Sequence, residues 1–374
     1  STGKATFTVD ASINSVNIGK GANSVSNNTV LGLSALDAAV TGNFNTAIGA
    51  AALTDLTSGS QNTAVGYNAG GNITTANFNT FIGSTAGANA TSGSNNTGIG
   101  QSALTQCTTG TNNTVVGRNA MPLLTEGATN TGMGSQALAQ LTTGDSNVAI
   151  GYAAGDAITT ASNNTCVGSA SLSSCTTGIA NVAVGLNSLN AATTANNNTA
   201  VGTNCMKLTT TGSQNTAVGE DALLTNTTGG QNIAMGRNAL RANTTASNNS
   251  ALGDLSLAAN TTGHSNVAVG AQALESNTTA NYNVAVGLQA LHDNSTGERC
   301  VAVGADALGS NTSANNNNAF GYNALLLNTT GTSNNAFGKS CLDANTTGSS
   351  NTGIGHNALG DNTTGSDNTA IGCN

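Results

Sequence analysis

Polar and apolar residues recur along this chain in a pattern that repeats every 17 residues. When Asn28 is taken as position one of a coil, position five is glycine from Gly32 to Gly372, in 21 successive cases without an insertion or a deletion. Position one is asparagine in 20 of the 21 cases, and position four is apolar in all of them. Such regular repetition predicts a single structural unit that stacks on itself many times.

The pattern inside each repeat is that of short β-strands separated by turns. Positions one to four, as in "NVAV" at residues 266–269, alternate and contain β-branched residues, which predicts a strand. A second extended segment is expected at positions twelve to fourteen, before a Gly or Ala at position fifteen. Seventeen residues are too few for a helical-hairpin repeat. The sequence therefore predicts an all-β fold, a parallel β-solenoid (β-roll) of about 20 coils spaced about 4.8 Å apart, roughly 95 Å in total.

The positions of the charges predict which residues are buried. Within the repeats, charged residues occur only at positions six, seven, ten, eleven, sixteen and seventeen, apart from Glu126 at position fourteen. Since charges are rarely buried unpaired, the uncharged positions are expected to form the interior and the turns. We predict a core from positions four and nine, turns at the glycines of position five, and hydrogen-bonded ladders of asparagine along the axis. Representative residues are Val218, Leu223, Ile354 and Leu359 for the core, Gly32, Gly49, Gly66, Gly219, Gly236 and Gly355 for the turns, and Asn28, Asn45, Asn62, Asn226, Asn243 and Asn260 for the ladders.

Two regions follow from where the repeats begin. Residues 1–27 precede them and are expected to be a lead-in that caps or attaches the solenoid. Residues 28–374 form the shaft, which is expected to continue or to be capped elsewhere because the sequence stops inside a coil. The lining at position twelve changes near residues 209–226, from mostly apolar residues to nine successive asparagines. We interpret this change as two segments of one solenoid.

A core this thin predicts association with other chains. Burial of the large apolar side chains at positions four and nine offsets only part of the cost of ordering the backbone of a 17-residue coil. Hydrogen bonds offset a further part, and contacts with further copies of the chain would add to them. A symmetric homo-oligomer is therefore expected.

The composition excludes several classes of function. The net charge is −8, which gives no support for binding of nucleic acid, since such binding needs a basic patch. No run of 18 apolar residues is present, and membrane insertion is not expected. The seven cysteines share no position in adjacent coils, and His264, His292 and His356 occupy different coils. We therefore predict no catalytic, metal or cofactor site, and a protein that is not an enzyme.

The sequence of the repeat resembles known fibrous proteins. The segments "NTAIG", "NVAVG" and "NNAFG" resemble the head repeats of trimeric autotransporter adhesins. The whole unit is similar to the "NTAVG…AL…NTTG" arrays of bacteriophage tail fibres and related virion proteins, and the lead-in "INSVNIGKGANSVSNNTVLG" at residues 13–32 is similar to the entry into such arrays. The resemblance covers residues 13–374. It implies a left-handed β-roll with three chains around one axis, and it supplies no catalytic residues.

The expected function is therefore that of a structural fibre for attachment to a host cell, most simply a phage tail fibre or virion fibre located in the virion. Expected partners are two further copies of the chain, other virion or fibre proteins at its ends, and a glycan or protein of the host surface. The alternative is a bacterial surface adhesin or a subunit of an extracellular filament. The threonines at positions thirteen and fourteen raise a minor alternative, an ice-binding solenoid. The sequence leaves open the receptor, the host and which end binds.

Overall fold

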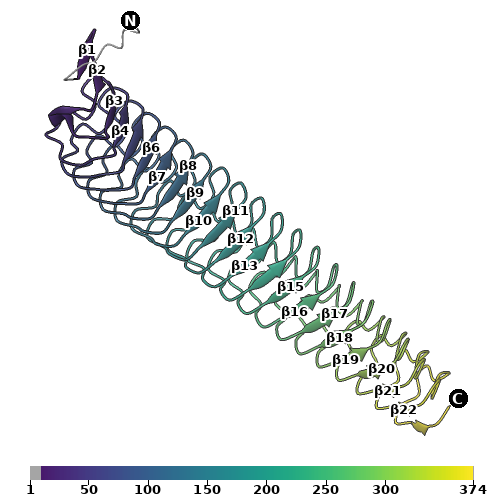
Figure 1. The fold of residues 1–374 in the computed structure, drawn as a ribbon. Coiled ribbons are helices and arrows are strands. Elements are labelled where there is room, and N and C mark those ends of the chain that lie inside the picture. The colour runs from purple at the N-terminus through teal and green to yellow at the C-terminus, as the bar shows by residue number, and fades with distance from the viewer. Residues whose placement is uncertain (1–9, 374) are drawn as a thin grey trace, which may run out of the picture. The chain divides into compact units, whose positions relative to one another are not determined.

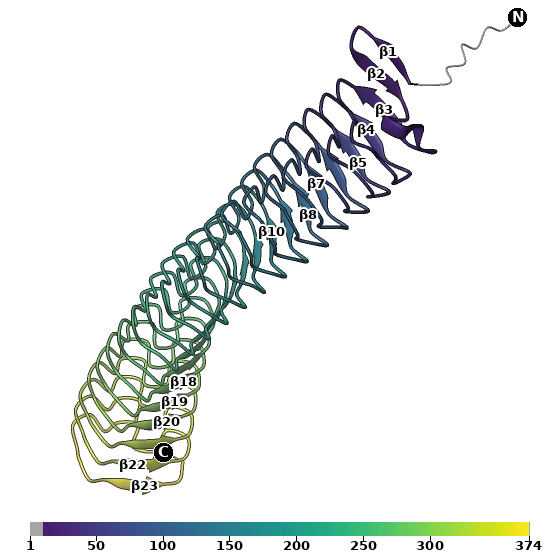
Figure 2. The ribbon, with the colours of Figure 1, turned by 90° about the vertical axis from the view of Figure 1, so that its left-hand side faces the viewer.

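The protein, in a computed structural model that describes residues 10–373, is built from short strands and turns. Among these residues the only helix is a single 3-10 turn, η1 (Ala22–Ser24). The chain divides into two compact units, Ser1–Ala180 and Asn181–Asn374. Each unit consists of successive 17-residue coils, in which every coil follows the one before and places its strand beside the preceding strand (Figures 1 and 2). The all-β parallel solenoid with a 17-residue period is thus confirmed.

The first unit contains a hairpin followed by coils that each contribute one strand. Neighbouring coils pair in parallel and in register, so that Thr46 lies opposite Thr63 and Ala47 opposite Ala64. The strands are β1 (Ala11–Ile13), β2 (Val16–Gly19), β3 (Thr29–Gly32), β4 (Thr46–Ile48), β5 (Thr63–Val65), β6 (Thr80–Ile82), β7 (Thr97–Ile99), β8 (Thr114–Val116), β9 (Thr131–Met133), β10 (Val148–Ile150) and β11 (Thr165–Val167).

The second unit repeats the same arrangement. Its strands also pair in parallel with a shift of 17 residues, as in Ala200 opposite Ala217. They are β12 (Val182–Val184), β13 (Thr199–Val201), β14 (Thr216–Val218), β15 (Ile233–Met235), β16 (Ser250–Leu252), β17 (Val267–Val269), β18 (Val284–Val286), β19 (Val301–Val303), β20 (Asn318–Phe320), β21 (Asn335–Phe337), β22 (Thr352–Ile354) and β23 (Thr369–Ile371).

The hairpin of β1 and β2 covers the outer edge of β3. Strand β2 pairs antiparallel with both β1 and β3, so the first parallel strand does not present its backbone groups as an open edge. The carboxylate of Asp10 accepts hydrogen bonds from the backbone amides of Lys20, at 2.7 Å, and of Gly21. The function of the lead-in, residues 1–27, stays a prediction, and its residues 1–9 lie outside the described part of the chain.

Positions twelve to fourteen do not form the second strand that the sequence predicts. In the described residues these positions contain bends, although their backbone still bonds from coil to coil. The backbone amide of Thr57 donates to the carbonyl of Thr74 at 2.9 Å, and its hydroxyl donates to the same carbonyl at 3.0 Å. Each coil therefore has one strand, and its remaining hydrogen bonds come from turns that stack on one another.

The interior of the coil is lined by positions three, eight, nine and twelve. Ala217, Ala222 and Leu223 are fully buried, whereas Val218 is 39% exposed and Ile354 is 40% exposed. The prediction that position four belongs to the core is therefore wrong. Successive side chains of a strand point to opposite faces, and the inward face of this strand is position three, which is usually alanine.

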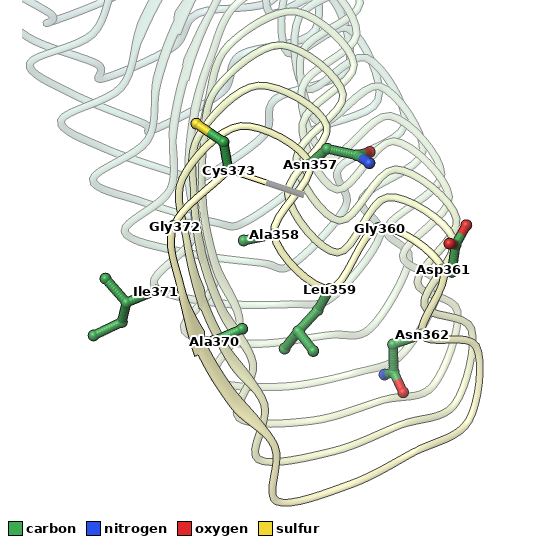
Figure 3. A pocket seen from close by; sticks show the side chains of 10 residues that line it. All are labelled: Asn357, Ala358, Leu359, Gly360, Asp361, Asn362, Ala370, Ile371, Gly372 and Cys373. Carbon is green, nitrogen blue, oxygen red and sulfur yellow. The ribbon is translucent and has the colours of Figure 1, made fainter.

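The final coils show this alternation directly. Figure 3 shows Leu359 and Ala370 pointing into the coil and Ile371 pointing away from it. Leu359 is only half-buried, and it lines a cavity of about 440 Å³ at the last coil. The long side chain at position nine fills most of the narrow interior, which limits the room at position three.

Candidate functional site

The glycines of position five are required for two separate reasons. Gly219 has a φ of +136°, a conformation that residues with a Cβ rarely adopt. A Cβ placed there would also lie 2.5 Å from the carbonyl oxygen of Gly236 in the next coil. Gly32, Gly49, Gly66, Gly236 and Gly355 approach the following coil in the same way. These residues fix the spacing between coils and are not arranged around a ligand.

The asparagines of position one tie each coil to the next. The side-chain oxygen of Asn28 accepts the backbone amide of Asn45 at 2.8 Å, and that of Asn45 accepts the backbone amide of Asn62 at 3.0 Å. The side-chain amide of Asn45 donates to the carbonyl of Gly59 at 3.0 Å. All three asparagines are buried. Because their donors and acceptors are paired inside the protein, burial of these amides carries little penalty.

A second asparagine ladder runs through the second unit at position twelve. The amide nitrogen of Asn243 donates to the side-chain oxygen of Asn226 at 2.9 Å, and that of Asn260 donates to Asn243 at 3.0 Å. The first member, Asn226, donates to the carbonyl of Gly229 at 3.0 Å. The series continues to Asn362 with every side-chain amide donating toward the N-terminus. Aligned chains of amide hydrogen bonds polarise and strengthen one another.

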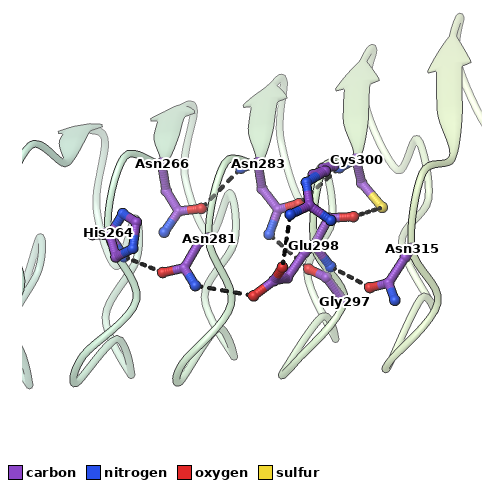
Figure 4. A network of polar contacts seen from close by, with 9 residues as sticks. His264, Asn266, Asn281, Asn283, Gly297, Glu298, Cys300 and Asn315 are labelled. Carbon is purple, nitrogen blue, oxygen red and sulfur yellow. Dashed lines mark hydrogen bonds and ion pairs between the residues drawn. The ribbon is translucent and has the colours of Figure 1, made fainter.

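The ladder of position one has a single substitution, Cys300. Its backbone amide still donates to the side-chain oxygen of Asn283, at 2.9 Å (Figure 4). Its thiol donates to the carbonyl of Ala314 at 3.3 Å, where an asparagine amide would do so. The thiol replaces the amide donor but offers no amide oxygen to the next coil. The role of this thiol is therefore structural.

A row of polar side chains at position sixteen links the same coils on the outside. The backbone amide of His264 donates to Asn281 at 2.8 Å, the side-chain amide of Asn281 donates to Glu298 at 3.0 Å, and the backbone amide of Glu298 donates to Asn315 at 2.6 Å (Figure 4). Each member of the row binds the coil beside it. This arrangement holds neighbouring coils together.

The buried cysteines are poor nucleophiles. Burial raises the pKa of Cys107 to about 12 and that of Cys175 to about 11, because the thiolate loses its hydration. Burial also raises the pKa of Cys166, and the neighbouring Cys175 raises it further. Comparing only equal positions in adjacent coils missed this proximity, since Cys166 and Cys175 occupy positions three and twelve of one coil. All seven cysteines are free, and Cys373 is exposed.

Residues 10–373 contain no cluster of three or more His, Cys, Asp and Glu side chains that could hold a metal ion. Within the same range, no helix is sufficiently long and apolar to cross a membrane. The residues that the sequence singled out are thus distributed along the stacked coils and do not converge on one place.

The outward side of the strands forms an uncharged surface, which we call the strand face. It consists of positions two and four, where position two is Thr, Val, Ile, Ser or Asn and position four is apolar. In the first unit Ile82, Met133 and Ile150 are exposed on this face. In the second unit Phe320 and Phe337 stack on it with ring centroids 4.8 Å apart. Contiguous apolar surface of this kind is typical of a site of interaction with another macromolecule.

No protein-family model matches the chain, and no curated protein is similar to it in sequence.

Proposed function

We propose that this protein is the subunit of a structural fibre that serves in attachment, and that several copies assemble through the strand face. The observation that carries the proposal is the row of apolar side chains at position four, which is present in every coil of both units and is exposed in 12 of the 21 cases and half-buried in the other nine. Neighbouring side chains of this row contact one another along the face, but the part of each that stays in water gains nothing from burial in the single chain. Covering this part with a second copy is favourable.

The apolar area of the strand face approaches that of a stable interface. A large aliphatic side chain has about 60–120 Å² of surface to bury, as its transfer free energy and a coefficient of about 25 cal/mol per Å² imply. Val218, Met235 and Leu252 are each about 40% exposed, which leaves about 25–50 Å² per residue. Twelve of the 21 residues at position four are exposed and nine are half-buried. The exposed ones contribute about 300–600 Å², the half-buried ones and position two add to this area, and a stable interface buries about 800 Å² per partner.

Charge also favours the strand face as the contact between copies. Each chain has a net charge of −8, so copies repel one another where charged positions meet. Positions one to five carry no charge in any coil. A partner with the same 17-residue period can place its apolar residues against this face in every coil, which a globular partner cannot do. A homo-oligomer, with three copies as the resemblance implies, fits these features.

The wider role of the protein follows from the resemblance of its repeats to virion and adhesin fibres. The proposed fibre is non-enzymatic, belongs to a phage tail or virion, and joins other virion or fibre proteins at its ends. A bacterial surface adhesin or an extracellular filament remains the alternative. The threonine hydroxyls of position thirteen donate to carbonyls of the next coil, as in Thr227 to Thr244 at 3.0 Å. These hydroxyls are therefore engaged, which counts against an ice-binding surface at that position.

The proposal is tested by disrupting the strand face without touching the core. A variant with aspartate at Val184, Val201 and Val218 places three charges on adjacent strands at positions that face outward. We expect its coils to fold, with an unchanged circular dichroism spectrum, while native mass spectrometry shows loss of the oligomer. Glu220→Ala, at a freely varying exposed position, serves as the control and should assemble normally. A folded wild-type monomer, or normal assembly of the triple variant, would show that the strand face is not the interface.

A further inference from the structure

We propose that the second unit carries a carbohydrate-binding groove on the side of the coils formed by positions seven, ten and eleven. This lateral groove is separate from the strand face. The inference rests on the proposed role in attachment, because it supplies the chemistry by which a fibre would recognise a surface. The proposed ligand contacts positions seven, ten and eleven, which vary between coils. The positions inside the coil vary less because they maintain the fold.

The lateral groove contains a cavity of about 390 Å³ centred on Ala258. This volume lies within the range of about 300–1,000 Å³ found for small-molecule sites. Position ten is long in the two adjacent coils, Arg241 and Glu275, and short at Ala258 between them. The depression therefore exists because one small residue separates two long ones.

The floor of the depression is apolar and its two rims are polar. Ala258 and Ala259 form the floor together with Leu255. Leu255 is the one large apolar residue at position seven, since the other 19 complete coils have a polar residue or alanine there. This leucine is not required by the coil, because position seven points outward and is occupied elsewhere by Asn, Gln, Asp, Ser or Thr.

The rims offer opposite hydrogen-bonding groups. The guanidinium of Arg241 forms no ion pair with any residue that the structure describes, so its donors are available. The carboxylate of Glu275 accepts from Nε2 of His292 at 3.2 Å and remains 27% exposed. One rim therefore donates and the other accepts. A pyranose ring matches this arrangement, because its hydroxyls both donate and accept and its C–H face can lie on the alanines and the leucine.

A second depression of about 170 Å³ repeats the design three coils further along. Gly309 is the short residue at position ten, His292 and Leu326 are the long ones on either side, and Asp306 supplies an acceptor. Three coils correspond to about 14 Å. The pair of Glu275 and His292 forms the ridge between the two depressions. A linear oligosaccharide that crosses this ridge would occupy both.

The ligand class is a neutral oligosaccharide. Glu275, Asp293 and Asp306 lie along the groove and would repel a sugar acid, and the whole chain is acidic. Each depression is shallow and lacks an aromatic platform. The binding free energy per non-hydrogen atom that is typical of small ligands corresponds to a Kd on the order of 1 mM for one sugar residue. Useful attachment would come from many copies acting together.

The test uses the full chain and three hexasaccharides: the neutral maltohexaose and chitohexaose, and the acidic hexagalacturonate. Saturation-transfer NMR should detect millimolar binding of at least one neutral hexamer and weaker binding of the acidic one. Ala258→Leu fills the larger depression. Position ten is already leucine at Leu224 and Leu326, so the coil of this variant should still fold. We expect it to weaken binding at least about tenfold. Glu275→Gln removes the charged acceptor and should weaken binding about threefold to tenfold.

The matched control is Ala139→Leu, the same change at position ten of the first unit, which should bind as the wild type does. Absence of binding by the neutral hexamers, preference for hexagalacturonate, or equal loss in Ala258→Leu and Ala139→Leu would overturn the proposal. Native mass spectrometry of the same samples separates the two proposals. An intact oligomer that binds no neutral sugar refutes the groove alone, whereas a folded monomer refutes the fibre assembly.

Discussion

The two units of this chain line the same coil with different chemistry. At position twelve the first unit has mostly aliphatic residues, including Leu56, Leu124 and Leu141, whereas nine successive coils of the second unit have asparagine from Asn226 onward. Both kinds of residue are buried. The period, the glycines and the strands are the same in both units. One backbone therefore accepts either an apolar stripe or a ladder of amides along its interior.

The two linings stabilise the coil by different means, and they respond differently to change. An apolar stripe gains from burial, which has no direction and depends on volume. An amide ladder gains from hydrogen bonds that each need a partner in the next coil, and a missing partner leaves a buried polar group unsatisfied. The ladder should therefore hold the register of the coils more strictly than the stripe does.

The largest expected effect comes from breaking the register. Deleting one residue between Gly219 and Gly236 shifts every later residue by one place relative to the coils before the cut, so every column that crosses the cut is interrupted there. Deleting a complete 17-residue unit from the same segment keeps all columns intact. We expect the first variant to lose cooperative folding of the coils beyond the cut, while the second melts within a few degrees of the wild type. Equal melting temperatures by circular dichroism would contradict the importance of register.

A substitution inside each lining compares the two directly. Asn260→Leu keeps the number and branching of the side-chain heavy atoms but leaves the oxygen of Asn243 without its donor and one N–H of the Asn277 amide without its acceptor. Two unsatisfied buried groups should lower the free energy of unfolding by about 2–6 kcal/mol. Leu141→Met, a change of similar size in the first unit, should lower it by less than about 1.5 kcal/mol. Denaturant unfolding of both variants measures the difference, and equal losses would mean that the linings are equivalent.

A smaller effect is expected from repairing the ladder of position one. Cys300→Asn would supply an amide oxygen to the next coil, at Asn317, and restore the amide donor to Ala314. We expect a gain of about 1 kcal/mol in the free energy of unfolding. The reverse change, Asn283→Cys, should cost a similar amount. If both variants prove less stable than the wild type, the continuity of the amides is not what stabilises this column.

The smallest effect concerns the start of the second lining. Thr209 is buried at position twelve, one coil before the asparagines, and its hydroxyl has no hydrogen-bond partner among the described residues. Thr209→Val extends the apolar lining by one coil and should raise the free energy of unfolding by about 1 kcal/mol. Thr227→Val removes a hydroxyl that bonds Thr244 and should lower it by about 0.5–1.5 kcal/mol. A loss of stability in the Thr209 variant would show that its hydroxyl is satisfied in solution.

The fold could be predicted from the sequence because a constant period of 17 leaves few alternatives. The glycines of position five and the uncharged positions also indicated the turns and the interior. The direction of position four was misjudged, since an invariant apolar residue was equated with a core residue. Neighbouring residues of a strand face opposite sides, and here Ala217 faces inward and Val218 outward. Alanine is small and occurs in many environments, so its sequence position did not identify it as a core residue.

Other features could not be predicted because residue type does not indicate them. Positions seven, nine and seventeen adopt a left-handed backbone conformation, with φ of +55° at Asp221, +53° at Leu223 and +59° at Gln231. Leucine rarely adopts such a conformation, so its presence at position nine suggested no turn there. The lateral groove depends on these turns, because they place positions seven, ten and eleven on one side.

The most direct test of the assembly through the strand face is an experimental structure of the assembled protein by electron cryomicroscopy. The expected map shows at least two copies, with Val218 and the other residues of position four covered by a neighbouring chain and Ala217 inside its own coil. A map in which position four faces solvent in every copy, or in which the particles are single chains, would contradict it.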